Sequence, residues 1–377
     1  MLGAVSAAAT VASIGYCTLA TVAGLRFASA RRRSLAILSK LPPVSILKPL
    51  KGADPEMYDA LRSHCLQDYP QYEILFGVTA SDDPAVPVVE KLIREFPQRK
   101  IRLLLCDKRL GANGKVSSLI QLAAAAKAEY LLVNDSDIRV EPNYLRTVIS
   151  ELQAPETGLV TCLYRGVPSA TLGSRLEALG ISTDFMPGVL AANVIEGGMH
   201  FGLGSTLAFR KGDVEAIGGF EAIADNLADD YELGRRIAEC KKVKLSAAVV
   251  ETHLPAYDQR GFVSHQLRWA RTIRASRPSG YAGLLLTFTL PWGLATALFC
   301  RGAIWAWTLF ALALFARGMM AIVSSRVVLG EKNKASLALL PIRDFVAVAV
   351  WIGGWFGNTI TWRGERFSLQ DGKLTPK

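Results

Sequence analysis

Cysteine is scarce in this chain, and the few cysteines are too scattered to form a disulfide framework or a zinc site. The 377 residues include six of them: Cys17, Cys65, Cys106, Cys162, Cys240 and Cys300. None belongs to a Cys-x-x-Cys pair, and two fall within long apolar segments. Disulfide-rich secreted domains and zinc modules need paired or clustered cysteines. The pattern therefore indicates a protein that folds in a reducing compartment.

Two glycine-rich phosphate-binding patterns are also absent. The P-loop pattern Gly-x-x-x-x-Gly-Lys-Ser/Thr does not occur, and no Gly-x-Gly-x-x-Gly follows the first strand-like run. ATP hydrolysis and dinucleotide binding are therefore unsupported. The chain has no internal repeat and no low-complexity linker. Its net charge of +10 does not predict nucleic-acid binding, because much of it lies beside apolar segments, where anionic lipid attracts basic residues.

Hydrophobic residues make up 50% of the chain and are concentrated at its two ends. Residues 3–28 carry one charge, Arg26, and are long enough to span about 30 Å of hydrocarbon at a rise of about 1.5 Å per residue. An arginine triplet at 31–33 follows, and the positive-inside rule places the rest of the chain beyond it in the cytoplasm. A cleaved signal peptide is the alternative, but its basic residues would come before the apolar stretch. We expect a membrane anchor.

Further apolar segments lie near the C-terminus, at 281–300, 304–324 and 345–360. With the anchor they predict four membrane spans. Proline and charged residues interrupt the stretch 337–344, which indicates a segment lying in the membrane interface. Arg317 stands inside an apolar segment, so we expect it to be paired within the helix bundle or to snorkel, with a functional role as the alternative.

The middle of the chain has the pattern of an α/β domain, because short apolar runs alternate with helical patterns. Strands are predicted at 44–47, 72–79, 101–106, 130–134 and 158–163, and helices at 56–65, 86–96 and 116–127. This order predicts a parallel sheet with crossover helices. The glycine-rich stretch 185–209 reads either as core strands with glycine turns or as a membrane-facing acceptor channel.

Two carboxylates follow the fourth predicted strand. Asp135 and Asp137 are two residues apart, so they project to the same side of an extended backbone. Ligands of open α/β sheets collect at the carboxyl ends of strands, where this pair lies. The pair can share one hard cation, or divide a metal and a sugar hydroxyl between them, and such a metal would neutralise a diphosphate. An Asp-x-Asp pattern alone is a weak signal, since acidic pairs are common in loops.

Other candidate residues come from three places. Asp83 follows the second strand, where it serves either as a nucleoside ligand or as the N-cap of the next helix. Lys115 lies in a glycine loop at a helix start, a position that attracts phosphate. Asp230 follows Asp229 at the start of a predicted helix, where acids are favoured by the helix dipole, and it is also a candidate general base.

The segment His265-Gln266-Leu267-Arg268-Trp269 begins a basic stretch just before the C-terminal apolar segments. Its spaced arginines predict an interfacial amphipathic helix. Arg268 has an alternative role, since a guanidinium can bind a departing diphosphate through two hydrogen bonds.

The order Asp83, Asp135, Asp230, then Arg268-Trp269 resembles the three-aspartate plus Gln/Arg-x-x-Arg-Trp pattern of inverting GT-A glycosyltransferases. More closely, the chain resembles ceramide glucosyltransferases and the bacterial relatives that glycosylate hopanoid lipids. The resemblance covers nearly the whole chain and implies an α/β, Rossmann-like GT-A domain with membrane helices on both sides. It implies that Asp83 contacts the uridine and that Asp230 is the base.

The same resemblance implies that Asp135 and Asp137 bind the ribose, the diphosphate and Mg²⁺ or Mn²⁺, and that Arg268 and Trp269 hold donor and acceptor near the membrane. Two positions depart from the pattern. His265 stands where the family has Gln or Arg, so its role stays undecided. Asp137 is a glycine in some animal ceramide enzymes, which favours the bacterial, hopanoid type.

The expected organisation has four parts: a membrane anchor with a basic cytosolic flank (1–33), a cytosolic catalytic domain (34–260), an interfacial helix (261–280) and a membrane region with about three spans (281–377). We expect a hexosyltransferase of the cell inner membrane. It would move one glucose or N-acetylglucosamine from a UDP-sugar to a hydroxyl of a ceramide or a hopanoid polyol. The alternatives are a processive polysaccharide synthase and a non-catalytic lipid-binding or transport protein.

Overall fold

The computed structural model describes residues 1–33, 41–54, 56–331, 335–362 and 365–376. It divides into two compact units, each assembled from segments far apart in the sequence. The first, which we call the sheet unit, is made of Ser34–Val167, Glu196–Pro255 and Thr359–Lys377. The second, the helical unit, is made of Met1–Arg33, Pro168–Ile195 and Ala256–Asn358.

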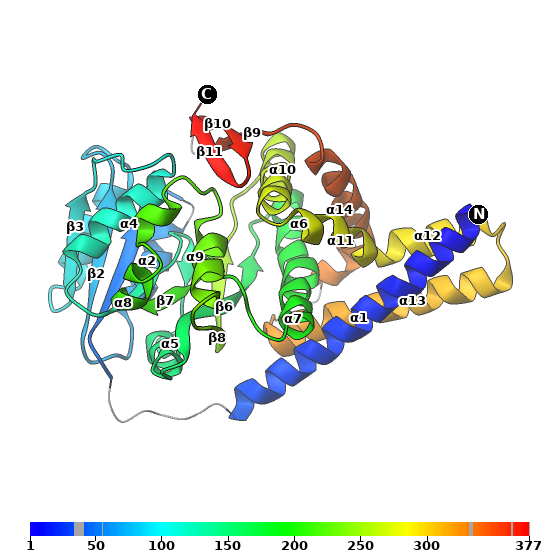
Figure 1. Cartoon of the computed structure of the whole chain (residues 1–377), viewed down its shortest axis with the longest axis horizontal. Helices are drawn as coiled ribbons and strands as arrows, with labels where there is room; N and C mark the ends of the chain where they lie inside the picture. The colour runs from blue at the N-terminus through cyan, green and yellow to red at the C-terminus, as the bar shows by residue number, and fades with distance from the viewer. Residues whose placement is uncertain (34–40, 55, 332–334, 363–364, 377) are drawn as a thin grey trace. The chain divides into compact units, whose positions relative to one another are not determined.

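A mixed sheet forms the core of the sheet unit (Figure 1). Among the described residues its eight strands run in the order β3-β2-β1-β4-β7-β6-β8-β5. Their bounds are β1 Val44–Pro49, β2 Tyr72–Val78, β3 Lys100–Leu105, β4 Tyr130–Val133, β5 Ile138–Arg139, β6 Thr157–Val167, β7 Leu207–Arg210 and β8 Lys242–His253. The central strands β1 and β2 are buried along nearly all their length, as expected of strands covered on both faces.

The strands β3, β2, β1 and β4 are parallel, as the sequence predicted. The predicted strand at 158–163 is β6, which runs in the same direction as these four, because β7 is antiparallel to both β4 and β6. The sheet is nevertheless mixed, since two strands that were not predicted, β7 and β5, run the opposite way, whereas β8 is parallel to β6. The reason is that β7 follows a chain excursion through the helical unit and re-enters the sheet from the opposite end.

Helices cover the sheet, and the three predicted at 56–65, 86–96 and 116–127 begin and end within two residues of those limits. They are α2 Met57–Cys65, α3 Ala85–Glu95, α4 Gly114–Ala125, α5 Tyr144–Leu152, α8 Lys211–Glu215, the short 3₁₀ helix η2 Phe220–Ile223 and α9 Asp229–Ala238. Helix α4 packs on β1 and β2, whereas α5 and α9 both pack on β6 and β8.

No strand was predicted after residue 360, but the structure forms a small sheet there. It consists of β9 Thr359–Trp362, β10 Glu365–Gln370 and β11 Lys373–Pro376, in the order β11-β10-β9 (Figure 1). The backbone of this sheet contacts the loop before α9: Leu227 N–H donates to Gly372 O at 3.0 Å and Leu374 N–H donates to Asp225 O at 2.8 Å. The end of the chain therefore belongs to the sheet unit.

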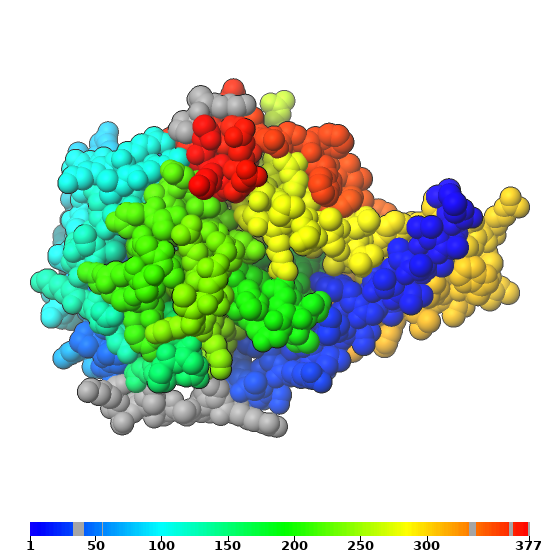
Figure 2. All heavy atoms as spheres, viewed as in Figure 1, coloured from blue at the N-terminus to red at the C-terminus, as the bar shows by residue number. Residues whose placement is uncertain are grey.

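The helical unit is formed by α1 Leu2–Arg33, α6 Leu172–Gly180, the π-helical turn η1 Ile181–Phe185, α7 Met186–Ile195, α10 Gln259–Ser276, α11 Pro278–Gly283, η3 Leu284–Thr287, α12 Thr289–Phe299, α13 Ile304–Ile322, η4 Val323–Val328, η5 Ala335–Leu339 and α14 Leu340–Gly354. Helix α1 packs against α7, α12 and α13, and the long side-by-side arrangement of α1 with α13 is visible in Figure 2. Large apolar side chains of α13, such as Trp305 and Phe315, are exposed, as lipid-facing residues are.

Four helices of the described chain are long and apolar enough to cross a membrane: Leu2–Arg32, Leu172–Ile195, Ile304–Val328 and Leu337–Gly354. The bent pair Pro278–Thr287 and Thr289–Phe299, which meet at 55°, makes up to five. The predicted segments at 3–28 and 304–324 are confirmed as helices of this kind. The third predicted segment, 281–300, is broken at Phe288 rather than continuous.

Three predictions about these segments were wrong. Leu172–Ile195 was not predicted as a span, because charged residues within it hide its apolar character. Of the two readings given for the stretch 185–209, core strands with glycine turns was wrong for its first half, which is α7; within the described residues Leu207–Arg210 is its strand. The last span begins at Leu337, includes the stretch assigned to the interface, and ends at Gly354, before the strand β9.

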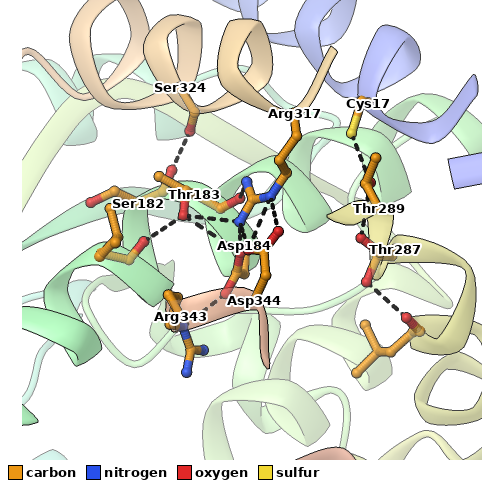
Figure 3. A network of polar contacts seen from close by, with 12 residues as sticks. Cys17, Ser182, Thr183, Asp184, Thr287, Thr289, Arg317, Ser324, Arg343 and Asp344 are labelled. Carbon is orange, nitrogen blue, oxygen red and sulfur yellow. Dashed lines mark hydrogen bonds and ion pairs between the residues drawn. The ribbon is translucent and has the colours of Figure 1, made fainter. Parts of the chain in front are cut away.

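The prediction that Arg317 is paired within the bundle is confirmed (Figure 3). Its guanidinium is buried and donates to Asp344 Oδ1 at 2.7 Å, to Asp184 Oδ1 at 2.6 Å and to Thr183 O at 2.8 Å. Asp184 is one of the charged residues that kept Leu172–Ile195 from being predicted as a span. A buried charge needs such partners, because an isolated one in an apolar medium is very unfavourable.

Candidate active site

The topology brings several of the predicted residues to one edge of the sheet. Strands β2, β1 and β4 are adjacent and parallel, so their carboxyl ends meet at the same edge. Asp83 follows β2, Lys48 ends β1, and Asp135 and Asp137 follow β4. This edge is where α/β sheets bind their ligands.

Lys115 connects the Asp-x-Asp segment to helix α9. Its Nζ lies 2.8 Å from Asp135 Oδ1 and 2.9 Å from Asp229 Oδ2. The side chain of Asn113 fixes the start of α4 by accepting the N–H groups of Lys115 and Val116. Burial would lower the pKa of Lys115, but the charges of Asp135 and Asp229 outweigh it and raise that pKa, so the ammonium stays charged.

Asp230 lies next to Asp135 across a glycine. Its Oδ2 accepts the N–H of Gly204 at 2.6 Å, and its Oδ1 accepts the N–H of Tyr231 at 2.8 Å. A Cβ atom on Gly204 would lie 2.8 Å from Asp135 Oδ2 and 3.1 Å from Asp230 Oδ2. Only glycine therefore allows the backbone to pass between these two carboxylates.

Burial raises the pKa of Asp230 to about 6, with the charge of Asp229 adding to the effect. Burial likewise raises the pKa of Asp229, against the opposing charge of Lys115. The two neighbouring acids thus have different surroundings. Asp229 is neutralised by a lysine, whereas Asp230 is held by backbone N–H groups and has a pKa suited to a general base near neutral pH.

Asp137 faces the last strand pair of the sheet. Its Oδ2 accepts the hydroxyl of Thr252, and its backbone carbonyl accepts the N–H of His253 at 3.3 Å. Burial, followed by the charge of Asp135, raises the pKa of Asp137 to about 6. Like charges held this close favour either a proton or a cation between them.

Asp83 does not have the simple N-cap role that was its alternative. Its Oδ1 accepts the N–H of Ala85 at 2.9 Å, but both carboxylate oxygens also accept the N–H of Gly52, at 3.0 and 3.2 Å. The cap position itself is Pro84. Asp83 therefore joins the loop after β1 to the start of α3 and remains at the same sheet edge as Asp135.

Three members of this site were not predicted from the sequence: Lys48, Asp229 and Gly204. Lys48 is fully buried, and its Nζ donates to the backbone carbonyl of Asp135 at 2.8 Å. Burial lowers its pKa to about 7. Lys48 could have been found by the rule that identified Asp135, since it also ends a buried strand. Gly204 had no such signal, because its role depends on a contact with residues far away in the sequence.

The donor set fits a hard divalent cation. Among the described residues, no cluster of three or more His, Cys, Asp or Glu side chains is arranged to hold a metal. Mg²⁺, however, commonly binds through one or two carboxylates and takes its other ligands from substrate phosphates and water. Asp135 and Asp137 supply two such carboxylates, and the charge of Asp135 adds to burial in raising the pKa of Asp137. They are the residues that would hold the metal.

The remaining predicted residues lie in the helical unit, on α10. His265 Nε2 lies 2.8 Å from Glu177 Oε1, and the Nη2 of Arg268 lies 3.2 Å from His265 Nδ1. The Trp269 ring packs on the rings of His265 and Phe185, each at a centroid distance of 5.7 Å. The structure thus brings His265, Arg268 and Trp269 together on one helix, as their spacing predicted.

The mixed α/β sheet, with its acidic and basic groups at the carboxyl ends of the strands, defines a glycosyltransferase domain of the GT-A class. Comparisons agree. A mannosyltransferase from Pyrobaculum calidifontis, solved in complex with GDP-Man and Mn²⁺, aligns with a TM-score of 0.51 and 20% identity over 94% of this chain and 98% of that one. This likeness concerns the fold.

Sequence relatives are more specific. Ceramide glucosyltransferase 3 of Caenorhabditis elegans is 25% identical over 347 residues, which cover 90% of this chain and 75% of that protein. The ceramide glucosyltransferase of Komagataella phaffii is 35% identical over 147 residues, 37% of this chain and 29% of that protein. The model of glycosyl transferase family 21 matches residues 5–375. The chain belongs to this family.

Proposed function

We propose that the protein transfers one sugar from a UDP-sugar to a hydroxyl of a membrane lipid, with inversion at the anomeric carbon. The observation that carries this proposal is the arrangement around Gly204, where Asp135 and Asp230 approach each other and Lys115 contacts Asp135. A cation-binding carboxylate, a lysine and a candidate base are thereby within reach of one diphosphate sugar. The named relatives, which are ceramide glucosyltransferases, support a lipid acceptor.

In this proposal each residue has a separate task. Asp83 and Asp135 bind the nucleoside, and Asp135 and Asp137 hold Mg²⁺ or Mn²⁺, which would neutralise the diphosphate charge. Lys115 adds a fixed positive charge beside the same site. Asp230 removes the proton from the acceptor hydroxyl, because an inverting transfer needs one base on the side opposite the leaving group. Arg268 meets the departing diphosphate, and Trp269 packs near the acceptor.

The apolar helices support a membrane location for the acceptor. We propose that the sheet unit faces the cytoplasm of a cell with the helices in the inner membrane, since the basic triplet 31–33 follows the first span. A soluble donor and a lipid acceptor can then reach the enzyme from different phases. Ceramide with a glucose donor, and a hopanoid polyol with an N-acetylglucosamine donor, are the two acceptor classes that we propose.

The decisive experiment is mass spectrometry of lipids from hosts that express the chain and make either ceramide or hopanoids. A product heavier than its lipid by one hexose or one N-acetylhexosamine supports the proposal and identifies the acceptor. Longer sugar chains would support a processive synthase instead. If the purified protein neither binds UDP-sugars nor releases UDP with either lipid, the proposal is wrong and a non-catalytic lipid-binding role gains support.

A further inference from the structure

The histidine that departs from the family pattern is held between two charged side chains. His265 Nε2 lies 2.8 Å from Oε1 of Glu177, and His265 Nδ1 lies 3.2 Å from Nη2 of Arg268. Glu177 comes from α6, about 90 residues earlier in the chain, and its side chain is only 3% exposed. The rings of Tyr257 and Trp269 also pack on the imidazole, at centroid distances of 5.2 and 5.7 Å.

These contacts indicate which nitrogen of the imidazole carries the proton. A guanidinium can only donate hydrogen bonds, so His265 Nδ1 must accept from Arg268 and carries no proton. In a neutral imidazole the proton is then on Nε2, the nitrogen that lies 2.8 Å from the Glu177 carboxylate. The geometry therefore assigns the neutral Nε2–H tautomer, which presents one donor and one acceptor. A glutamine amide presents the same pair, which explains how histidine can replace the Gln of the family pattern.

Glu177 is itself held in place by a chain of polar contacts from the membrane helices. Gln266 Nε2 donates to Glu177 Oε2 at 3.3 Å, and the Oε1 of the same amide accepts from Arg343 Nη1 at 3.0 Å. Arg343 in turn donates to Asp184 Oδ2 at 2.9 Å, and Asp184 also pairs with Arg317 (Figure 3). The chain of contacts thus runs from α13, through η1 and α14, to Gln266 on α10 and from there to Glu177 on α6.

One glycine makes room for this arrangement. A Cβ atom on Gly180 would lie 2.4 Å from Arg343 Nε and 2.5 Å from Arg343 Nη2. These distances are far below van der Waals contact, so any side chain at position 180 would displace the guanidinium. The position of Arg343, and through Gln266 that of Glu177, depends on this close approach.

We propose that Glu177 is a positioning residue that acts through His265 to orient Arg268 and Trp269. The role rests on the proposed function, in which Arg268 meets the departing diphosphate. The negative charge of Glu177, 2.8 Å from Nε2, favours the proton on that nitrogen, and the unprotonated Nδ1 then orients the guanidinium of Arg268. A carboxylate behind a histidine commonly has this effect on the group that the histidine contacts.

The first test does not need catalytic turnover. Protein labelled with ¹⁵N-histidine contains four labelled residues, and loss of one signal in His265→Ala assigns the signal of His265. We expect a protonated Nε2 and an unprotonated Nδ1 in the wild-type protein. In Glu177→Leu we expect a mixture of tautomers. An imidazolium or a protonated Nδ1 in the wild-type protein would overturn the proposal, whether or not the protein is shown to glycosylate a lipid.

The second test is kinetic. Glu177→Leu should lower kcat about tenfold to a hundredfold, because a misplaced Arg268 is felt most in the transition state, and it should change KM for the donor much less. His265→Ala should cause a similar loss, and His265→Gln should retain most activity. Adding Glu177→Leu to His265→Ala should then cause no further loss. Losses that multiply in the double variant would mean that Glu177 does not act through His265.

Glu151→Gln is the matched control, because Glu151 is another buried glutamate that lies in the sheet unit and accepts the N–H of Ala247 at 3.0 Å. It should keep the wild-type kcat. Glu177→Gln retains an acceptor for His265 but cannot serve both His265 and Gln266, so its kcat should lie between those of wild type and Glu177→Leu. A Glu177→Gln variant as impaired as Glu177→Leu, with unchanged folding, would contradict the positioning role.

Discussion

The Nζ atom of Lys115 lies 2.8 Å from Oδ1 of Asp135, although one residue comes from the first turn of α4 and the other from the loop after β4. The same nitrogen lies 2.9 Å from Oδ2 of Asp229 at the start of α9. One cation therefore joins two acidic segments that are separated by more than ninety residues. It reduces the repulsion between their carboxylates and leaves a positive charge beside the place proposed for the diphosphate.

Replacing this cation should weaken donor binding. Lys115→Met is expected to raise the Kd for the UDP-sugar about tenfold to a hundredfold, since a charged hydrogen-bond partner contributes about 1.5–3 kcal/mol. Calorimetric titration of the purified variant measures the change. Lys115→Arg should lose less affinity, and Lys127→Met, which alters an exposed lysine of the same unit, should lose none. Unchanged affinity in Lys115→Met would remove Lys115 from the donor site.

Asp230→Asn should abolish turnover but leave UDP binding intact. The amide oxygen can still accept the N–H of Gly204, although the amide nitrogen cannot accept the N–H of Tyr231, and the amide cannot take a proton from the acceptor. We expect kcat to fall by about 10²–10⁴, the usual contribution of a general base. Asp229→Asn is the matched comparison and should weaken donor binding instead, because it removes the partner of Lys115. Loss of UDP binding in Asp230→Asn would assign Asp230 to the donor site.

The activity of the protein should decrease as the pH falls below about 6. Burial and the charge of Asp229 raise the pKa of Asp230 to about 6, so below that pH the carboxyl is protonated and cannot act as a base. Activity is therefore expected to rise as the pH increases through this value. The pKa of Asp137 is also raised to about 6, but a bound cation competes with its proton. At saturating metal, a decrease of kcat that still occurs below about pH 6 should therefore reflect protonation of Asp230. A flat profile from pH 5 to 8 would reject this assignment.

Asp137 should govern the response to metal. Asp137→Ala removes one of the two carboxylates and leaves Asp135, which is already paired with Lys115. We expect the concentration of Mg²⁺ or Mn²⁺ that gives half-maximal activity to rise about tenfold or more. The measurement is a metal titration of activity after treatment with a chelator. Thr252→Val, which removes only the hydroxyl that Asp137 accepts, should cause a smaller change. An identical metal response in wild type and Asp137→Ala would reject the ligand role.

Arg317 and Asp344 form a buried ion pair in the helical unit. Removing one partner should destabilise the protein more than removing both. Arg317→Met leaves the Asp344 carboxylate without its guanidinium partner and should lower the free energy of unfolding by about 3–5 kcal/mol. The double variant Arg317→Met, Asp344→Leu should recover much of that loss, because Asp184 keeps Arg343 as a partner. Thermal unfolding in detergent measures both. Arg32→Met, at an exposed arginine, should have little effect. A double variant as unstable as Arg317→Met alone would contradict this account.

Local pattern was sufficient for much of the fold. The runs at 44–47, 72–79 and 130–134 are strands because they are short, apolar and bounded by turn residues, and the structure confirms them as β1, β2 and β4. The amphipathic pattern after Gly114 is likewise α4. Sequence periodicity does not specify the direction of a distant strand, so the antiparallel insertion of β7 between β4 and β6 was not predicted.

The span at Leu172–Ile195 was missed because its charged residues have partners that lie far away in the sequence. The span at Leu172–Ile195 contains Glu177 and Asp184, which lower its hydropathy when the sequence is read alone. In the structure Glu177 accepts a hydrogen bond from Gln266 and lies beside His265, and Asp184 is paired with Arg317, so both carboxylates have polar partners inside the helical unit. The partners lie about 90 and 130 residues away, and no local window contains them.

By itself, the sequence determined which residues end the buried strands, and therefore that Asp83, Asp135 and Asp137 lie at one edge of a sheet. It also determined that the chain has apolar helices at both ends, because hydropathy is a local property. Only the tertiary structure decided that Asp229, and not Asp230, is the partner of Lys115 and that Gly204 separates Asp135 from Asp230. These relationships depend on atoms that approach within 3 Å from segments far apart in the chain, and that proximity arises only when the core has packed.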